Sequence, residues 1–253
     1  MGLRDQLTVV IPHRRHRPLL ERALQSVDGW RVLVADDTDD GIDLDIPRVR
    51  LGGGQGFARV VNRALDAVTT PCAVVLNDDA APERDCLEQL CRRGGLCGPV
   101  LVGPRGVESA GIHVRGWGRV VSLHAVPDAD RPVDALSGAC LHLPTHLRFD
   151  EHFRHGFEDV ELCQRATRAG QVPWLVAGAR CWHEGGATVP RDSEAAQRHA
   201  VAGQLRLVAP GWRDAVVVGL AVAQVVREGG PLTRLRGVAQ GWADGRRPRP
   251  PDP

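Results

Sequence analysis

The chain has 253 residues, of which 43% are apolar and 25% charged, and 32 basic against 31 acidic residues give a net charge of +1. This composition is that of a folded globular protein, and the balanced charge gives no overall field to attract nucleic acid. Every basic residue is arginine, so the absence of lysine excludes pyridoxal-phosphate enzymes, lysine aldolases and Walker-type phosphate loops.

The first part of the chain alternates strand-like and helix-like segments. Apolar and β-branched runs predict strands at 7–11, 32–35 and 73–76. Helical spacing of apolar residues follows each strand, at 18–27, after Gly56 and at 82–93. Strands followed by helices in this order predict βαβ units around a mainly parallel sheet.

The pattern changes along the rest of the chain. Short strands and turns are expected from 96 to 143, then a helix at 159–169 and a strand at 173–177. From 191 onward only helical patterns occur, at 193–208, 213–227 and 232–244. We therefore expect an α/β domain at 1–190, a helical extension at 191–245 and a disordered tail at 246–253.

The cysteines and the apolar runs indicate in which cellular compartment the protein is expected. Seven cysteines at irregular spacing predict reduced thiols, and the apolar run at 7–11 is too short for a secretory signal, so we expect a cytoplasmic protein. Cys86, Cys91 and Cys97 do not have the paired spacing of a zinc knuckle, which favours buried thiols over a zinc site.

Acidic residues collect where two of the predicted strands end. Asp36 and Asp37 follow the second strand, and Asp78 and Asp79 follow the third. Ligands of parallel sheets bind at these carboxyl ends, where carboxylates hold a cation or a ribose. A solvated acidic turn is the alternative. The glycine loop at 52–56 has no dinucleotide fingerprint, and no serine stands in a nucleophile elbow.

A series of short motifs follows in order along the chain. They are TVVIP at 8–12, VADD at 34–37, GFARVVN at 56–62, LNDDA at 76–80, LSGAC at 136–140, FDEHF at 149–153, GFEDVEL at 156–162 and CWH at 181–183. Over about residues 7 to 190 this series resembles the family 2 glycosyltransferases, and within them the bacterial rhamnosyltransferase-like branch.

The resemblance implies an α/β protein of GT-A fold, with a mainly parallel central sheet and one nucleotide-binding domain. It also implies an inverting transfer of a sugar from a nucleotide-diphosphate donor to a hydroxyl of a glycan, lipid-linked or small-molecule acceptor, as in cell-wall or polysaccharide biosynthesis. A divalent Mg²⁺ or Mn²⁺ would neutralise the leaving diphosphate, a task that no lysine can share in this chain.

The resemblance also assigns roles to residues. Asp159, in the acidic pair with Glu158, would be the catalytic base, and Asp79 and His183 would hold the metal. Gly138 and Ala139 would line the sugar and acceptor side. The residues expected to bind the donor are Pro12, Arg14, Asp36, Asp37, Asn62, Asn77 and Asp78. The alternatives are a helix cap for Asp159, a structural histidine at 183 and a polar residue on the helix surface at Asn62.

Two features leave other functions open. Asn77 stands where many relatives carry an aspartate, which favours the alternative of an inactive GT-A module that binds nucleotide or glycan as a partner subunit. A glycoside hydrolase is disfavoured, because its acids would not gather at the strand ends of a nucleotide site. The apolar run 215–226 is too short to span a bilayer but is followed by arginines, so it predicts either a packed helix or peripheral membrane contact.

Overall fold

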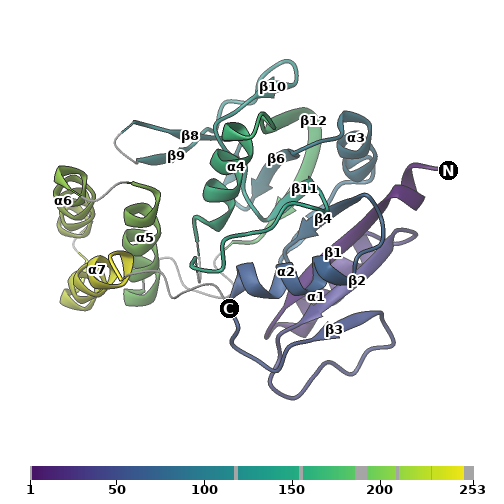
Figure 1. Cartoon of the computed structure of the whole chain (residues 1–253), viewed down its shortest axis with the longest axis horizontal. Coiled ribbons are helices and arrows are strands. Elements are labelled where there is room, and N and C mark those ends of the chain that lie inside the picture. Colours follow the sequence, from purple (N-terminus) through teal and green to yellow (C-terminus); the bar gives the residue numbers. More distant parts are fainter. Residues whose placement is uncertain are drawn as a thin grey trace.

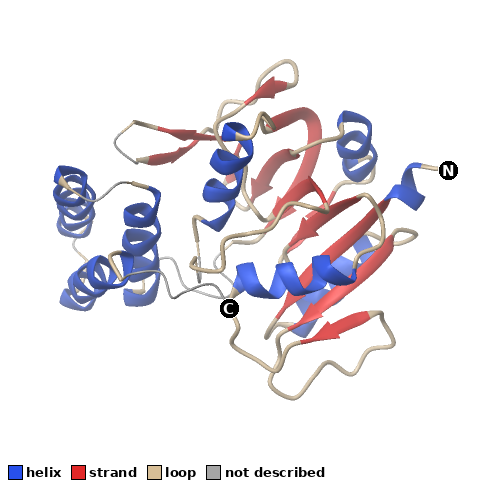
Figure 2. Ribbon diagram, in the orientation of Figure 1, coloured by secondary structure: helices blue, strands red, loops and turns tan. Residues whose placement is uncertain are grey.

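A mixed sheet runs through the centre of the protein in the computed structural model (Figures 1 and 2). The structure describes residues 2–116, 119–153, 156–185, 193–208, 211–228 and 230–247. The strands of the main sheet are β1 (Leu7–His13), β2 (Arg31–Asp36), β3 (Arg48–Arg50), β4 (Cys72–Leu76), β5 (Ala80–Pro82), β6 (Cys97–Gly103), β7 (Gly106–Ser109), β10 (Arg131–Pro132), β11 (Cys140–Pro144) and β12 (Trp174–His183).

The strand directions bring the carboxyl ends of the parallel strands to one edge of the sheet. The order is β10-β12-β6-β11-β4-β1-β2-β3, with β5 beside β12 and β7 beside β6. Strands β1 to β4 pair in parallel, β11 is antiparallel to both β4 and β6, and β12 is parallel to β6. The ends of β1, β2, β4, β6 and β12 therefore face the same way, as the alternating pattern predicts.

Helices cover both faces of this sheet. They are α1 (Arg17–Ser26), α2 (Phe57–Ala67), α3 (Cys86–Arg93) and α4 (Glu158–Arg168). One core cluster joins α2 and α4 to Val10 of β1, while the other joins α1 and α3 to Val9 and Ile11. Successive strand residues point to opposite faces, so a continuous apolar strand supplies both cores. The predicted α/β fold, with helices around a central and mainly parallel sheet, is confirmed.

Several elements differ from the sequence expectations. Strand β12 continues to His183, well beyond the predicted 173–177, because it pairs with β6 and β5 along its length. Helix α3 begins at Cys86 because Pro82 belongs to β5. A small second sheet of β8 (Ile112–Val114) and β9 (Val120–Ser122) lies in the region expected to form short strands.

Three C-terminal helices form a separate small core, beside the sheet in Figure 1. They are α5 (Glu194–Leu207), α6 (Trp212–Arg227) and α7 (Leu232–Gly245). Helix α7 approaches α5 along a row of glycines, where an added Cβ would lie 2.4 Å from the Glu194 carbonyl at Gly237 and 2.6 Å from the Arg198 carbonyl at Gly241. Only glycine allows this spacing, so the two helices pack as one unit.

The predicted extension is thus helical, but its boundary at 190 lies outside the described residues, as does most of the predicted tail. None of the helices in the described ranges combines the length and hydropathy needed to cross a membrane.

All seven cysteines are unpaired thiols, and five of them are buried. Burial raises the pKa of Cys91 to about 11, so this thiol stays protonated at neutral pH. Of the three cysteines interpreted as buried thiols rather than zinc ligands, Cys86 and Cys97 are buried and Cys91 is half-buried.

Candidate active site

Two acidic runs and two histidines meet at the carboxyl edge of the sheet. His13 ends β1, and its Nδ1 lies 2.6 Å from Oδ2 of Asp78 in the turn after β4. His13 is 3% exposed, so this contact holds Asp78 against the end of β1. The neighbouring Pro12 pairs with Ala35 of β2 and is only partly exposed. The predicted donor residues Pro12 and Asp78 therefore lie on adjacent strand ends.

Asp36, at the end of β2, organises the turn that follows it. Its Oδ1 accepts hydrogen bonds from the backbone and hydroxyl of Thr38, at 3.1 and 2.6 Å, and its Oδ2 accepts one from the Ile42 N–H at 3.0 Å. Burial raises the pKa of Asp36, but the hydrogen bonds from Thr38 and Ile42 outweigh it and hold the pKa below its ordinary value. Its contact with a nucleoside stays a prediction, since the carboxylate is fully buried in this turn.

Asp37 joins the second strand to the glycine loop. Both of its carboxylate oxygens lie 3.2 Å from the backbone nitrogen of Gln55, which donates to them, and Nη1 of Arg14 lies 3.5 Å away. Gly54 of the same loop has φ +71°, and a Cβ there would lie 3.3 Å from the Arg14 guanidinium. The predicted donor residues Arg14 and Asp37 are thus in contact, and the loop between them requires glycine.

Asp79 and His183 face one another across β5 and β12. His183 is the last residue of β12 and pairs with Ala80 of β5, which places its Nε2 3.3 Å from Oδ1 of Asp79. Burial raises the pKa of Asp79, but hydrogen bonding to His183 and the charge of His183 outweigh it, so the pKa is lowered overall. The two predicted metal ligands are therefore neighbours, although they are 104 positions apart in the chain.

Glu108 holds the other nitrogen of the same imidazole. Its Oε2 lies 2.8 Å from Nδ1 of His183, so the ring stands between two carboxylates. Burial lowers the pKa of His183, but Asp79 and Glu108 together raise it to about 10. Sequence reasoning did not find Glu108, because it comes from β7, which only folds back beside the site through its pairing with β6.

The donor atoms around Asp79 suit a hard divalent cation. Beside the Asp79 carboxylate and the His183 imidazole, Oδ1 of Asn77 is buried and has no hydrogen-bond partner among the described residues. The described part contains no group of three or more His, Cys, Asp or Glu side chains able to hold a metal. Mg²⁺ and Mn²⁺ fit such a sparse oxygen and nitrogen set, because substrate phosphates and water complete their coordination.

The predicted catalytic pair begins α4. Asp159 Oδ2 accepts a hydrogen bond from the Gly138 N–H at 2.8 Å, and Oδ1 accepts one from the Val160 N–H at 2.8 Å. The residue at the N-cap of α4 is Phe157, with φ 71°, so Asp159 is not the N-cap itself, although its charge lies in the first turn as the alternative of a helix-end role expected. Asp159 lies in the first turn, and one of its oxygens reaches across to the segment before β11.

Glu158 and Asp159 are both desolvated, but they differ in their hydrogen bonds. Glu158 is 8% exposed, and its Oε2 has no hydrogen-bond partner among the described residues. Burial and then the charge of Asp159 raise the pKa of Glu158 to about 8. Burial also raises the pKa of Asp159, although its hydrogen bonds from Gly138 and Val160 oppose this. We therefore take Glu158 as the neutral member of the pair and Asp159 as the carboxylate.

One hydrogen-bonded path links the two halves of the site. The Asn77 N–H donates to the Ala139 carbonyl at 2.9 Å, next to Gly138, which donates to Asp159. An added Cβ on Gly138 would lie 3.5 Å from the Asp159 Cβ. The predicted acceptor-side residues Gly138 and Ala139 thus stand between the acidic run and the catalytic pair.

Asn62 has a structural role. Its Nδ2 donates to the Phe149 carbonyl at 2.9 Å and to Oε1 of Glu151 at 3.0 Å, and its Oδ1 accepts from the Phe149 N–H at 2.9 Å. The residue is 7% exposed. The alternative of a polar residue on the helix surface is wrong, and because the whole amide is engaged we leave Asn62 out of the donor site proposed below.

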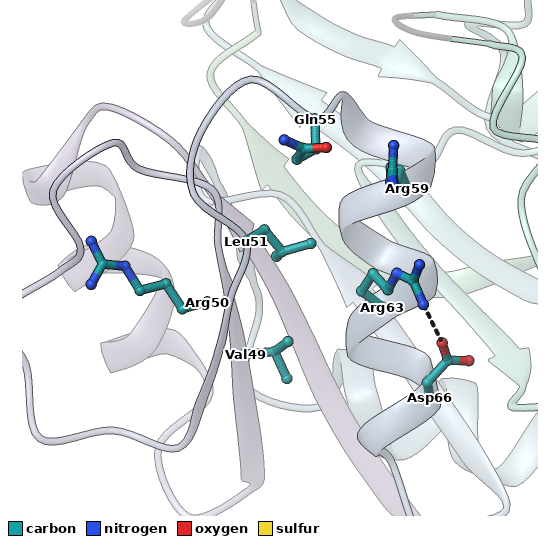
Figure 3. A pocket seen from close by; sticks show the side chains of 7 residues that line it. All are labelled: Val49, Arg50, Leu51, Gln55, Arg59, Arg63 and Asp66. Carbon is teal, nitrogen blue, oxygen red and sulfur yellow. Dashed lines mark ion pairs between the residues drawn. The ribbon is translucent and has the colours of Figure 1, made fainter.

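A groove of about 390 Å³ lies outside this constellation, between β3 and α2. Figure 3 shows Val49 and Leu51 directed toward α2, and the ion pair of Arg63 with Asp66, at 3.9 Å, on the helix side. The groove contains none of the predicted site residues. It reaches the site only at Gln55, whose N–H bonds Asp37.

Known proteins of similar sequence and structure bear on the class of protein. No protein-family model matches the chain. Over 189 residues it is 33% identical to the pre-mycofactocin glycosyltransferase of Mycobacterium tuberculosis. The matched region covers 65% of this chain and 39% of that protein. The chain therefore matches well under half the length of this curated relative.

Solved structures show the fold. The structure of GalNAc-T7 with UDP, GalNAc and Mn²⁺ superposes with a TM-score of 0.61 at 11% identity, over 94% of this chain and 54% of that one. The mannosyltransferase PcManGT of Pyrobaculum calidifontis, in complex with GDP-Man and Mn²⁺, superposes with a TM-score of 0.56 at 13% identity. The match covers 95% of this chain and 86% of that one. S. aureus TarS superposes with a TM-score of 0.53 at 14% identity, over 87% of this chain and 43% of that one. The chain has the GT-A glycosyltransferase fold, as the sequence predicted.

Proposed function

We propose that this protein transfers a sugar from a nucleotide-diphosphate donor to a hydroxyl group of its acceptor. The observation that carries the proposal is the path from Asn77 through Ala139 and Gly138 to Asp159, which joins the acidic edge proposed to bind metal to a half-buried carboxylate. The similarity to a pre-mycofactocin glycosyltransferase supports glycosyl transfer. The motif series supports membership of family 2 and its rhamnosyltransferase-like branch.

The donor is proposed to lie over the ends of β1, β2 and β4. Pro12, Asp37 and Asp78 border this edge, and Arg14 supplies a guanidinium next to the glycine loop. The neighbours solved with UDP, UDP-GlcNAc and GDP-Man support a nucleotide-sugar donor. With no lysine in the chain, arginine and the metal are left to neutralise the diphosphate.

Asp79 and His183 would hold Mg²⁺ or Mn²⁺, and the buried Asn77 Oδ1, two positions before Asp79 and without a hydrogen-bond partner among the described residues, is a further candidate oxygen ligand. The bound cation would stabilise the charge that develops on the leaving diphosphate. His183 would bind it through Nε2 while Glu108 accepts the Nδ1 proton, the arrangement that fixes metal-binding histidines in proteins.

Asp159 is proposed as the general base. It would take the proton from the acceptor hydroxyl as the oxygen attacks C1, on the face opposite the leaving diphosphate, which inverts the configuration. The Gly138 and Val160 N–H groups hold its two oxygens in place. Glu158 stays protonated beside it, so the pair carries a single negative charge.

A thermal-shift panel tests the proposal. UDP, dTDP and GDP are each added with Mn²⁺ and with EDTA, and one of them is expected to raise the melting temperature only when metal is present. No shift with any nucleotide would contradict donor binding. The alternative of an inactive nucleotide-binding subunit, favoured by Asn77, predicts the same shift but no donor hydrolysis by the purified protein.

A further inference from the structure

The C-terminal helices expose an unusual share of the large apolar side chains. Among the residues that the structure describes, eight large hydrophobic side chains are exposed, and six of them lie in α6 and α7. They are Trp212 (68%), Leu220 (44%), Val222 (38%), Val226 (66%), Leu232 (79%) and Trp242 (52%). The feature is therefore confined to one unit of the fold.

On α6 these side chains form one continuous face, which we call the α6 face. The helix buries Val217, Ala221 and Val225, one per turn, in the small core shared with α5 and α7. At about 100° per residue, the exposed positions opposite them cover roughly 160° of the helix. The α6 face consists of Trp212, Ala215, Gly219, Leu220, Val222, Ala223 and Val226.

Nothing in the described part of the protein covers this face. No charged residue occurs between Asp214 and Arg227, and Gln224 is the one amide on the helix. A Cβ added at Gly219, in the middle of the α6 face, would meet no atom within 4 Å. An uncovered apolar face of this width marks a contact surface.

Helices α6 and α7 and the residues that flank them carry a net positive charge. The segment 211–247 has six arginines and three acids, and each acid forms an ion pair inside the helical unit. These pairs are Asp214 with Arg246, Glu228 with Arg234, and Asp244 with Arg198. Arg227 and Arg236 are exposed and form no ion pair with other described residues, and the Arg213 guanidinium lies 5.6 Å from the centre of the Trp212 ring.

We propose that the α6 face binds the surface of an anionic membrane, with α6 lying in the plane of the interface. An apolar face bordered by arginine and tryptophan suits the boundary between acyl chains and anionic headgroups. The helix has 16 residues, which is shorter than a span requires. A second copy, bound by two-fold symmetry through this face, would bring the same arginines together, which disfavours that occupant.

Vesicle co-sedimentation of the full chain tests this without nucleotide, so the result is independent of the proposed glycosyl transfer. We expect sedimentation with vesicles of phosphatidylcholine and phosphatidylglycerol, and about ten-fold less with phosphatidylcholine alone. Val222→Glu with Val226→Glu should abolish binding, whereas Val172→Glu, at a 42% exposed valine outside the unit, should not change it. Arg227→Glu with Arg236→Glu should weaken binding to the anionic vesicles only.

Two outcomes would overturn the proposal. One is equal sedimentation of the parent protein and the Val222→Glu, Val226→Glu variant. The other is a dimer in light scattering that this variant dissociates, without any vesicle binding by the parent. Because both valines are exposed, the variant should keep the melting temperature of the parent, which confirms that it is folded.

Discussion

Asp159 and Gly138, 21 positions apart in the chain, share a hydrogen bond of 2.8 Å from the Gly138 backbone N–H to the Asp159 carboxylate. The bond fixes the first turn of α4 to the segment that leads into β11, and Asn77 bonds the next residue of that segment, Ala139. The proposed base is thus held by backbone groups, which have no side-chain freedom to lose when the acceptor binds.

Asp159→Asn should remove transfer while leaving donor binding intact. The amide oxygen can still accept the Gly138 N–H, but the side chain no longer accepts a proton from the acceptor, so we expect a loss of about 10²–10⁴ in kcat. The nucleotide-induced thermal shift should match that of the parent protein. Glu161→Gln, which removes another acid of the same helix turn, is the control. Full activity of Asp159→Asn would rule out its role as base.

Glu158→Gln should change the pH dependence of stability. The pKa of Glu158 is about 8 in the folded protein and 4.5 when unperturbed, so between these values the folded state holds a proton that the unfolded state has lost. The free energy of unfolding contributed by this group therefore falls as pH rises, by at most about 1.4 kcal/mol per pH unit.

Glutamine at position 158 has no proton to lose, so the free energy of unfolding of the variant does not fall with pH on account of this residue. We expect Glu158→Gln to be more stable than the parent protein at pH 9, with the advantage shrinking at pH 5. Urea denaturation at the two pH values measures it. An advantage that is the same at both pH values would contradict a protonated Glu158.

Glu108→Ala should weaken Mn²⁺ binding even though Glu108 is not proposed as a ligand. Without its carboxylate the His183 ring loses the acceptor at Nδ1, 2.8 Å away, that orients Nε2 toward Asp79. Loss of such a partner lowers metal affinity by about 10- to 100-fold. Electron paramagnetic resonance of free Mn²⁺, with the nucleoside diphosphate present, measures the affinity directly.

Glu108→Gln separates the orientation of the His183 ring from the negative charge of Glu108. Its amide oxygen can accept the same Nδ1 proton, so most of the affinity should return. Equal loss in the alanine and glutamine variants would indicate that charge, rather than orientation, is what Glu108 supplies.

Asp79→Asn and His183→Gln should each abolish the metal dependence of the nucleotide-induced thermal shift. Both remove a proposed ligand, and the remaining donors are too few to hold the cation against EDTA. Glu184→Gln is the matched control, because Glu184 is next to His183 but its carboxylate pairs with Arg22. A shift that still requires Mn²⁺ in either variant would place the metal elsewhere.

Gly203→Ala should impair catalysis from outside the site. A Cβ at this position of α5 would lie 2.5 Å from the Phe157 ring and 3.1 Å from the Gly156 carbonyl, in the loop that leads into Glu158 and Asp159. We expect a lower kcat with unchanged nucleotide affinity, because the clash falls on the loop that leads into the catalytic pair.

Gly219→Ala provides the matched control on α6, where a Cβ meets no atom within 4 Å. Alanine there should leave kcat unchanged and stabilise the helix by about 0.5–1 kcal/mol. If Gly203→Ala also left kcat unchanged, the helical unit would have no influence on the catalytic pair.

The sequence by itself determined the order of strands and helices and the gathering of acids at strand ends. Both are local properties: apolar periodicity defines each element, and parallel connections bring the ends of β1, β2 and β4 to one edge. The pairing of Asp79 with His183 could also be predicted, because the motif series brings them together.

Only the tertiary structure decided which polar side chains are engaged in hydrogen bonds inside the protein. Asp36 is held by its own turn and Asn62 by Phe149, while Glu108 reaches His183 across 75 positions through the β6–β7 pairing. No local pattern distinguishes these residues from exposed acids and amides, because burial and hydrogen-bond partners depend on segments far apart in the chain. Likewise, the apolar run 215–226 predicted either a packed helix or one in peripheral contact with a membrane. Only the packing of Val217, Ala221 and Val225 showed which face of the helix is left uncovered.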